Sequence, residues 1–228
     1  MPSEIKDELD QQSARYRELY AGVIYDVLEH FGYPNQVLSH QFSPLAREMK
    51  LAGPAFTMKG TMSCERDEQS RYKRLNMIKQ MRRPCIEVRD CGTPFPLAMY
   101  GELSATTAAA HGATGALIDG GVRDTGKLIS MGFPVFARYR TPIEAFGRWA
   151  LLDYQVPILI SGELTTSVQV NPGDFIFADF DGVIVIPKDL VSRVLEECER
   201  VMGIEDLARK EFARGDDPVT VFERHRRL

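Results

Sequence analysis

The sequence predicts an α/β protein, a single layered sandwich domain with helices at its N- and C-terminal ends. Short apolar runs alternate with helix-like segments between residues 50 and 140. A strand-dense stretch follows between residues 156 and 187, interrupted by turn-forming sequences. With 228 residues, 44% of them hydrophobic, the chain is long enough to bury one good core. Together these observations indicate a mixed α/β layered domain.

The first part of the chain is expected to be helical. Residues 1–20 have the polar composition of a helical arm. Residues 21–32 carry apolar side chains at helical spacing and end at Gly32, a residue that commonly stops helices. We therefore place the α/β domain after the arm, at residues 21–187.

Strands and helices alternate through the rest of the chain. Apolar runs between turn-forming residues predict the strands, and polar segments or helical spacing predict the helices. The expected strands are residues 50–60, 85–90, 115–118, 133–139, 156–162, 165–170, 174–182 and 183–187. The expected helices are residues 62–83, 103–111, 124–132 and 188–213, and a polar tail ends the chain.

Charge and cysteine content argue against several protein classes. The formal net charge is −4 and the isoelectric point is near 5.7, whereas nucleic-acid surfaces usually carry a basic excess. The one basic cluster, residues 71–83, is interpreted as a solvated helix face in preference to an RNA-binding patch. The four cysteines form no CxxC pair, the N-terminus is charged throughout, and no apolar run approaches the roughly 20 residues that span a bilayer. We expect a cytoplasmic protein with no nucleic-acid or membrane partner.

The segment LIDGGVRDTG places two charged residues directly after a strand. The strand is expected to end near Asp119, with Gly120 and Gly121 allowing a turn at positive φ. Asp124 could then simply cap the next helix, with Arg123 on the surface. Alternatively, the fork of Arg123 grips a carboxylate while Asp124 offers hard oxygen to a divalent cation. Ligands favour the carboxyl ends of strands in open α/β sheets, which supports the second interpretation.

The segment GELS, Gly101–Ser104, begins a predicted helix. Free N–H groups and the helix dipole favour an anion there, although Glu102 is also simply a favoured residue in a first turn. The two segments together offer a carboxylate site, made of these amides and Arg123. They also offer a cation site, made of Asp124 with Glu102 nearby.

The predicted C-terminal helix carries one further candidate. Its apolar stripe includes Cys198, and Glu205 follows seven residues later at nearly the same angle. A carboxylate on the line of an apolar stripe is unusual. It either marks the exposed end of the stripe or serves a site.

These residues resemble a known family. The segments GELSATTAAAHGATGALIDGGVRD and GFPVFARYRTP are similar to the regulator of ribonuclease activity A and its relatives, which include the 4-hydroxy-4-methyl-2-oxoglutarate and 4-carboxy-4-hydroxy-2-oxoadipate aldolases. The resemblance covers roughly residues 15–215. It implies an α/β sandwich related to swivelling phosphohistidine domains. It also implies a homotrimer or hexamer with active sites between subunits, in which residues 188–228 contact a neighbouring subunit.

The resemblance also implies residue roles. Arg123 would bind the substrate and Asp124 would hold Mg²⁺ or Mn²⁺. The backbone amides of Gly101, Glu102, Leu103 and Ser104 would bind the pyruvyl carboxylate, and the Glu102 side chain would lie in the water shell of the metal.

A glutamate from the neighbouring subunit would complete the site. The family pattern E-x3-R-x5-G matches Glu205, Arg209 and Gly215. The resemblance therefore selects the same glutamate as the helical spacing, and assigns it a catalytic role beside Arg123 and Glu102.

These roles imply a class II aldolase that releases pyruvate from 4-hydroxy-2-oxo acids such as 4-hydroxy-4-methyl-2-oxoglutarate. Decarboxylation of oxaloacetate would follow from the same enolate. Two alternatives remain open. The protein could be a non-enzymatic regulator that binds a ribonuclease or helicase of RNA decay. It could also be a lyase for a sugar-acid-derived 2-oxo acid, with residues 62–83 and 138–155 shaping a different pocket around Trp149.

Overall fold

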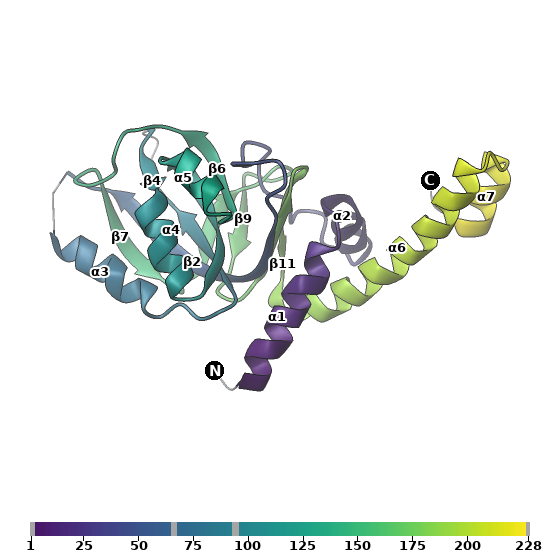
Figure 1. Ribbon diagram of the computed structural model, residues 1–228, viewed down its shortest axis with the longest axis horizontal. Coiled ribbons are helices and arrows are strands. Elements are labelled where there is room, and N and C mark those ends of the chain that lie inside the picture. The colour runs from purple at the N-terminus through teal and green to yellow at the C-terminus, as the bar shows by residue number, and fades with distance from the viewer. Residues whose placement is uncertain (1–2, 65–67, 93–95, 227–228) are drawn as a thin grey trace.

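The computed structural model describes residues 3–64, 68–92 and 96–226, and Figure 1 shows the arrangement of their elements. Within these residues the main sheet has nine strands in the order β1-β6-β5-β3-β2-β10-β11, with β4 beside β5 and β7 beside β2. The strands are β1 (Ser43–Pro44), β2 (Leu51–Met62), β3 (Cys85–Asp90), β4 (Ala98–Tyr100), β5 (Ala113–Val122), β6 (Val135–Arg140), β7 (Trp149–Tyr154), β10 (Phe175–Asp179) and β11 (Gly182–Ile186). A separate two-stranded sheet pairs β8 (Ile158–Ser161) with β9 (Ser167–Val170).

Helical connections make the centre of the main sheet parallel. β2 pairs with β3, β3 with β5, and β5 with both β6 and β4, all in parallel. Parallel neighbours need crossover connections, which α3, α4 and α5 supply. β7, β10 and β11 add antiparallel strands. The helices are α1 (Ser3–Arg17), α2 (Ala21–His30), α3 (Glu68–Ile78), α4 (Glu102–Ala110), α5 (Thr125–Ser130), α6 (Val191–Ala213) and α7 (Pro218–His225), with a 3₁₀ turn η1 (Lys188–Leu190) before α6.

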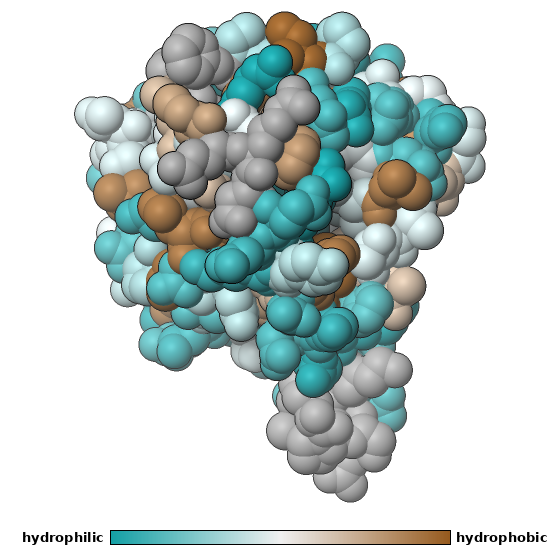
Figure 2. Space-filling model, turned by 90° about the vertical axis from the view of Figure 1, so that its left-hand side faces the viewer, coloured by the Kyte–Doolittle hydropathy of each residue, from teal (hydrophilic) through white to brown (hydrophobic). Residues whose placement is uncertain are grey.

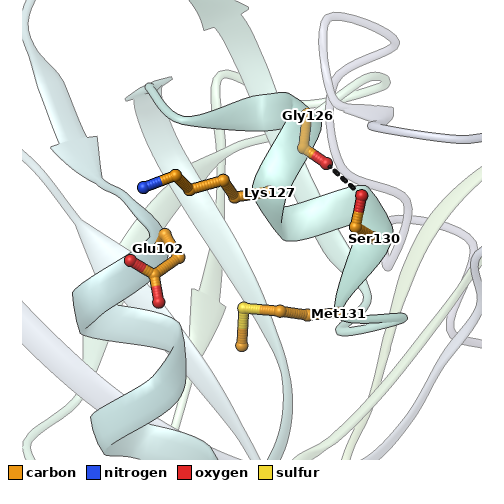
Figure 3. Close-up of a pocket in the computed structure, with 5 residues that line it drawn as sticks. All are labelled: Glu102, Gly126, Lys127, Ser130 and Met131. Carbon is orange, nitrogen blue, oxygen red and sulfur yellow. Dashed lines mark hydrogen bonds between the residues drawn. The ribbon is translucent and has the colours of Figure 1, made fainter.

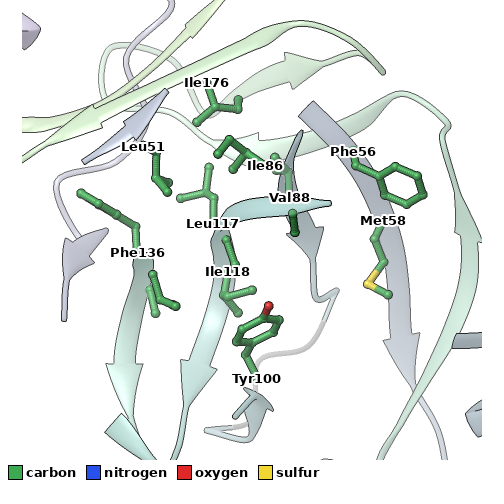
Figure 4. Close-up of a cluster of buried hydrophobic side chains, with 14 of the residues drawn as sticks. Leu51, Phe56, Met58, Ile86, Val88, Tyr100, Leu117, Ile118, Phe136 and Ile176 are labelled. Carbon is green, nitrogen blue, oxygen red and sulfur yellow. The ribbon is translucent and has the colours of Figure 1, made fainter. Parts of the chain in front are cut away.

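Two apolar clusters hold the sheet and the terminal helices together. Figure 4 shows the larger cluster, which surrounds the parallel strands and includes Ile86, Leu117 and Phe136. The smaller cluster packs α1, α2 and α6 against β10 and β11, where the rings of Tyr16 and Phe175 lie 4.4 Å apart. Beyond this cluster α6 leads away from the sheet and carries α7 (Figure 1). No helix formed by the described residues is long and apolar enough to cross a membrane.

The observed elements confirm most of the expected ones. The mixed α/β class is confirmed, and each expected strand coincides with an observed strand. The helices expected at residues 1–20, 21–32 and 188–213 correspond to α1, α2 and η1 with α6. In the expected helix 62–83, α3 occupies only the middle, and residues 65–67 lie outside the described residues. The kinship with phosphohistidine domains stays a prediction, as do the domain limits.

The turn expected at Gly120 and Gly121 is wrong. β5 runs through both glycines to Val122, and positive φ occurs instead at Asp124, at +58°. The glycines serve close packing. A Cβ on Gly121 would lie 2.3 Å from Cε2 of Tyr139 and 2.7 Å from the carbonyl oxygen of Leu97. The missing side chain therefore lets β4 lie against β5.

Four elements were not expected from the sequence. β1 and β4 have two and three residues, too few to show a periodic pattern, and β7 mixes buried and exposed residues without regular alternation. α7 lies in the segment expected to be a polar tail. Its signal is in the sequence, because Asp217 accepts a hydrogen bond from the Thr220 amide at 2.9 Å and Pro218 takes the first helical position.

We predict that Gly121→Ala destabilises the fold, because its Cβ has no space between Tyr139 and Leu97. The free energy of unfolding, measured by chemical denaturation, should fall by about 1–3 kcal/mol, the usual cost of overpacking. Gly126→Ala is the matched control, since nothing lies within 4 Å of its Cβ position on α5. That variant should be neutral or slightly stabilising. Equal stability of the two variants would contradict the packing role.

Candidate functional site

The ends of β4 and β5 bring the two predicted segments together. The strands are parallel neighbours, with Tyr100 opposite Val122, so both chains leave the sheet at the same edge. The amide of Arg123 donates to the carbonyl oxygen of Tyr100 at 2.9 Å. A Cβ on Gly101 would lie 2.7 Å from Oδ2 of Asp124, so a side chain at residue 101 would displace this carboxylate. The first turn of α4 therefore lies directly against the Arg123–Asp124 pair.

Asp124 occupies the N-cap position of α5 without capping it. Its backbone is left-handed, with φ +58° and ψ +30°, and its side chain makes no hydrogen bond to α5. Oδ2 instead accepts a hydrogen bond from the Glu102 amide of α4 at 3.3 Å. Among residues other than glycine, Asn and Asp tolerate a left-handed backbone best, and the conformation costs of order 1–2 kcal/mol. In this conformation the Asp124 carboxylate, which is 41% exposed, points toward the start of α4.

Arg123 keeps unused donors. Nε lies 3.7 Å from Oδ2 of Asp124, and Nη2 lies 3.7 Å from Oε1 of Glu144. Both separations are ion-pair distances, longer than a hydrogen bond. The planar guanidinium is 38% exposed, so its fork remains able to bind a carboxylate or carbonyl oxygen.

A cavity of about 640 Å³ joins these groups. Its lining includes Gly101, Leu103, Ser104, Arg123 and Asp124, all of which the sequence singled out. Its other walls come from α3, the loop before β7, and Trp149. Trp149 itself is largely buried, and its Nε1 donates to the carbonyl oxygen of Cys91 at 2.8 Å. The face of the molecule on the side of α3 carries mainly hydrophilic residues with scattered hydrophobic ones (Figure 2).

The side chain of Glu102 lies in a second, open hollow of about 400 Å³ (Figure 3). Its Oε1 accepts a hydrogen bond from Thr106 Oγ1 at 2.9 Å. Lys127 extends from α5 toward the same hollow, which Met131 also lines. The backbone of Glu102 thus belongs to the Arg123–Asp124 site, while its carboxylate points into the neighbouring hollow.

Glu205 is held within its own chain, away from Arg123 and Asp124. It lies on α6, 18% exposed, where the hydroxyl of Tyr20 donates to Oε2 and Nη2 of Arg209 lies 4.0 Å away. Burial raises the pKa of Tyr20 to about 12, and the hydrogen bond to Glu205 adds to the effect. Within one chain α6 leads away from the α4 and α5 end of the molecule (Figure 1). Glu205 would therefore have to reach a site on a second copy.

A buried ion pair that was not anticipated lies beneath the site. Arg89 and Glu87 of β3 are fully buried, and Nε of Arg89 donates to Oε1 of Glu87 at 2.7 Å. Nη1 of Arg89 donates to the carbonyl oxygen of Met99 at 2.5 Å, and the Arg89 Cζ lies 4.7 Å from the Tyr100 ring centroid. Burial raises the pKa of Tyr100 well above its usual value, and Glu87 raises it further. These contacts fix β4 immediately before Gly101.

The sequence did not single out the arginines of α3, although one open alternative had residues 62–83 shaping a pocket. The sequence interpretation of residues 71–83 as a solvated face is incomplete, because Arg71 and Arg74 line the cavity. The signal is their spacing. Arg71, Arg74, Leu75 and Ile78 follow the i, i+3, i+4, i+7 pattern of one helix face, and the buried Ile78 turns that face inward.

The residues of the site fit a divalent cation of the magnesium type. No cluster of three or more His, Cys, Asp or Glu side chains that could hold a metal occurs among the described residues. Mg²⁺ does not need such a cluster, because it commonly binds through one or two carboxylates and keeps water and substrate oxygens. Asp124 offers one partly exposed carboxylate without a capping role, and Glu144 lines the same cavity. Asp124 is therefore the residue able to hold the cation.

In this cavity an arginine, a carboxylate and a helix N-terminus meet just beyond the ends of parallel strands. This combination is typical of α/β proteins that bind small acids. A family model described as RraA-like, Aldolase/RraA, matches residues 21–185. This chain therefore belongs to the RraA-like family.

Individual relatives agree with this assignment. Protein DlpA of Legionella pneumophila is 29% identical over 192 residues, 84% of this chain but only 30% of DlpA. A Halalkalibacterium halodurans protein named "Putative 4-hydroxy-4-methyl-2-oxoglutarate aldolase" is 28% identical over 189 residues, 82% of this chain and 81% of that protein. The crystal structure of Streptomyces coelicolor RraAS2, described as an unusual member of the RNase ES inhibitor RraA protein family, has a TM-score of 0.72 at 20% identity. It covers 87% of this chain and 96% of that one, which shows a shared fold.

We predict that Arg89→Met strongly destabilises the protein, because it leaves the Glu87 carboxylate buried without its partner. Breaking a buried pair in this way costs about 3–5 kcal/mol, whereas replacing both members by apolar residues is often nearly neutral. The double variant Glu87→Leu with Arg89→Met should therefore be more stable than the single variant in guanidinium unfolding. A single variant as stable as the wild type would show that the pair does not hold β4.

Proposed function

We propose that this protein is a divalent-metal-dependent lyase that releases pyruvate from 4-hydroxy-2-oxo acids, such as 4-hydroxy-4-methyl-2-oxoglutarate. Oxaloacetate decarboxylation is the expected side activity. The observation that carries the proposal is the meeting of Arg123, Asp124 and the first turn of α4 in one cavity. The aldolase name of the Halalkalibacterium halodurans relative supports it.

The first turn of α4 binds the substrate carboxylate in this proposal. The amides of the first turn of a helix have no intrahelical acceptors, and the helix dipole adds a partial positive charge. The Glu102 amide donates to Asp124, which leaves the amides of Leu103 and Ser104 for the ligand. The pyruvyl carboxylate lies there, with its 2-oxo group toward Asp124 and Arg123.

Asp124 would hold the metal, which would act as a Lewis acid toward the negative charge that C–C cleavage produces. Arg123 donates to the oxo group and offsets the charge that develops on its oxygen. In the retro-aldol reaction a base removes the proton of the 4-hydroxyl group, the C3–C4 bond breaks, and its electron pair forms the enolate of pyruvate. A proton then adds to C3. In oxaloacetate the same bond breaks with loss of carbon dioxide.

Glu205 is the group proposed to move these protons, through water, in the site of a neighbouring subunit. The shape of the chain supports this. α6 and α7 extend from the sheet, and they expose apolar side chains such as Leu207, which is 54% exposed, and Val219, 63% exposed (Figure 1). An arm of this kind suits a homotrimer or hexamer in which the α6 of one copy completes the site of the next.

We predict that the protein releases pyruvate from oxaloacetate and from 4-hydroxy-4-methyl-2-oxoglutarate only with Mg²⁺ or Mn²⁺, and that a chelator stops the release. Asp124→Asn and Arg123→Met should each lower kcat about a hundredfold or more, the usual effect of losing one group that stabilises developing charge. A coupled lactate dehydrogenase assay measures the pyruvate.

Lys127→Met is the matched control, because Lys127 is a nearby cation that lines the other hollow. It should retain wild-type activity. Chelator-resistant release, or loss of release in the Lys127 variant, would contradict the metal-dependent mechanism. No release from any 2-oxo acid would instead favour a non-enzymatic regulator.

A further inference from the structure

α3 places two arginines on the wall of the cavity that holds Arg123. Arg71 and Arg74 both line it, one helical turn apart. Nothing in the proposed chemistry at the start of α4 uses them. Their position on a separate element, beyond the pyruvyl-binding amides, raises the question of which ligand they serve.

Arg74 is the more buried of the two arginines. It is half-buried, and it makes no hydrogen bond or ion pair with another described residue. Burial lowers the pKa of Arg74 to about 10, and the positive charges of Arg89 and Arg71 contribute to the decrease. Glu87 and Glu144 attract Arg74 and act in the opposite direction, but neither forms an ion pair with it. A partly desolvated guanidinium with no ion-pair partner among the described residues is suited to an anionic ligand.

Arg71 is held beside it. The Arg71 Cζ lies 3.6 Å from the centroid of the Phe146 ring, and Nη1 lies 3.6 Å from Oε1 of Glu68. Stacking on the ring restricts the guanidinium while leaving hydrogen-bond donors at its edge available. The guanidinium of Arg71 is therefore partly fixed in position beside Arg74.

The described charges only partly compensate this pair, since Glu68 lies at ion-pair distance from Arg71 alone. Among its described lining residues, three arginines face two carboxylates. Both carboxylates, Asp124 and Glu144, lie at ion-pair distance from Arg123. In the proposed reaction, the substrate carboxylate at α4 and the cation on Asp124 leave the donors of Arg71 and Arg74 on the cavity wall unused.

We propose that Arg71 and Arg74 bind a second carboxylate of the substrate, at the end away from its 2-oxo acid group, and so select dicarboxylic substrates. This inference rests on the proposed function, since it assigns the other end of the same substrate. The volume of about 640 Å³ accommodates such a ligand. A guanidinium fork matches a carboxylate through two parallel hydrogen bonds, which gives Arg an advantage over Lys at this position.

The test uses a pair of ligands that differ only at the far end. 2-Oxoglutarate carries a carboxylate there and 2-oxopentanoate a methyl group, and neither can undergo retro-aldol cleavage. In calorimetric titrations with Mg²⁺ present, wild-type protein should bind 2-oxoglutarate about tenfold or more tightly, the equivalent of one charge-assisted hydrogen bond. Arg74→Met should abolish this preference while leaving the affinity for 2-oxopentanoate within about twofold.

Two further variants distinguish binding by the guanidinium fork from a general effect of positive charge near the cavity. Arg74→Lys keeps the charge without the fork and should retain only part of the preference. Lys79→Met removes an exposed cation just after α3, bonded to Asn76 Oδ1 at 3.1 Å and outside the cavity, and should retain all of it. Equal binding of both ligands by the wild type would overturn the proposal, as would an equal loss of the preference in the Lys79 variant.

The outcome is independent of the chemistry at Asp124. An Arg74-dependent preference for 2-oxoglutarate without any pyruvate release would support this anion site and contradict the proposed reaction. Metal-dependent pyruvate release without the preference would support the reaction and overturn the anion site.

Discussion

The position of the site depends on one buried ion pair, Glu87 with Arg89. Both side chains are fully buried, so the energy of removing two charges from water has to be offset by close contacts. Burial alone would lower the pKa of Arg89, but Glu87 and Tyr100 outweigh it, so the pKa is raised and the guanidinium stays charged. Its remaining bond goes to the Met99 carbonyl of β4. The buried guanidinium of Arg89 on β3 thereby holds β4, the short strand that ends at the start of α4.

The second constraint is close approach between backbones. β4 can lie against β5 because residue 121 has no side chain, and the start of α4 lies so close to Asp124 that a Cβ on residue 101 would displace the carboxylate. The left-handed backbone of Asp124 then turns its carboxylate toward the Glu102 amide. The first-turn amides of α4, the fork of Arg123 and the carboxylate of Asp124 thus come together from two adjacent strand ends. Few side-chain contacts are needed to bring them there.

Much of this arrangement could be predicted from the sequence, because strand ends and helix starts leave local signals. Arg123, Asp124 and Gly101–Ser104 were found in this way, and the structure brings them together. Side-chain direction was less predictable, since the Glu102 carboxylate points into a separate hollow. The buried pair was missed because CIEVRD alternates like a half-exposed strand, whereas the structure buries both faces of β3. Whether Glu205 completes a site depends on a second copy, which one chain does not contain.

The most direct test is a crystal structure of the protein with Mn²⁺ and oxalate, a stable analogue of the pyruvate enolate. We predict an anomalous manganese peak at the Asp124 carboxylate, with oxalate contacting Arg123 and the amides of Leu103 and Ser104. We also predict that Glu205 from a neighbouring copy lies within the reach of a bridging water. Manganese and oxalate bound elsewhere, with the cavity at the start of α4 empty, would contradict these predictions.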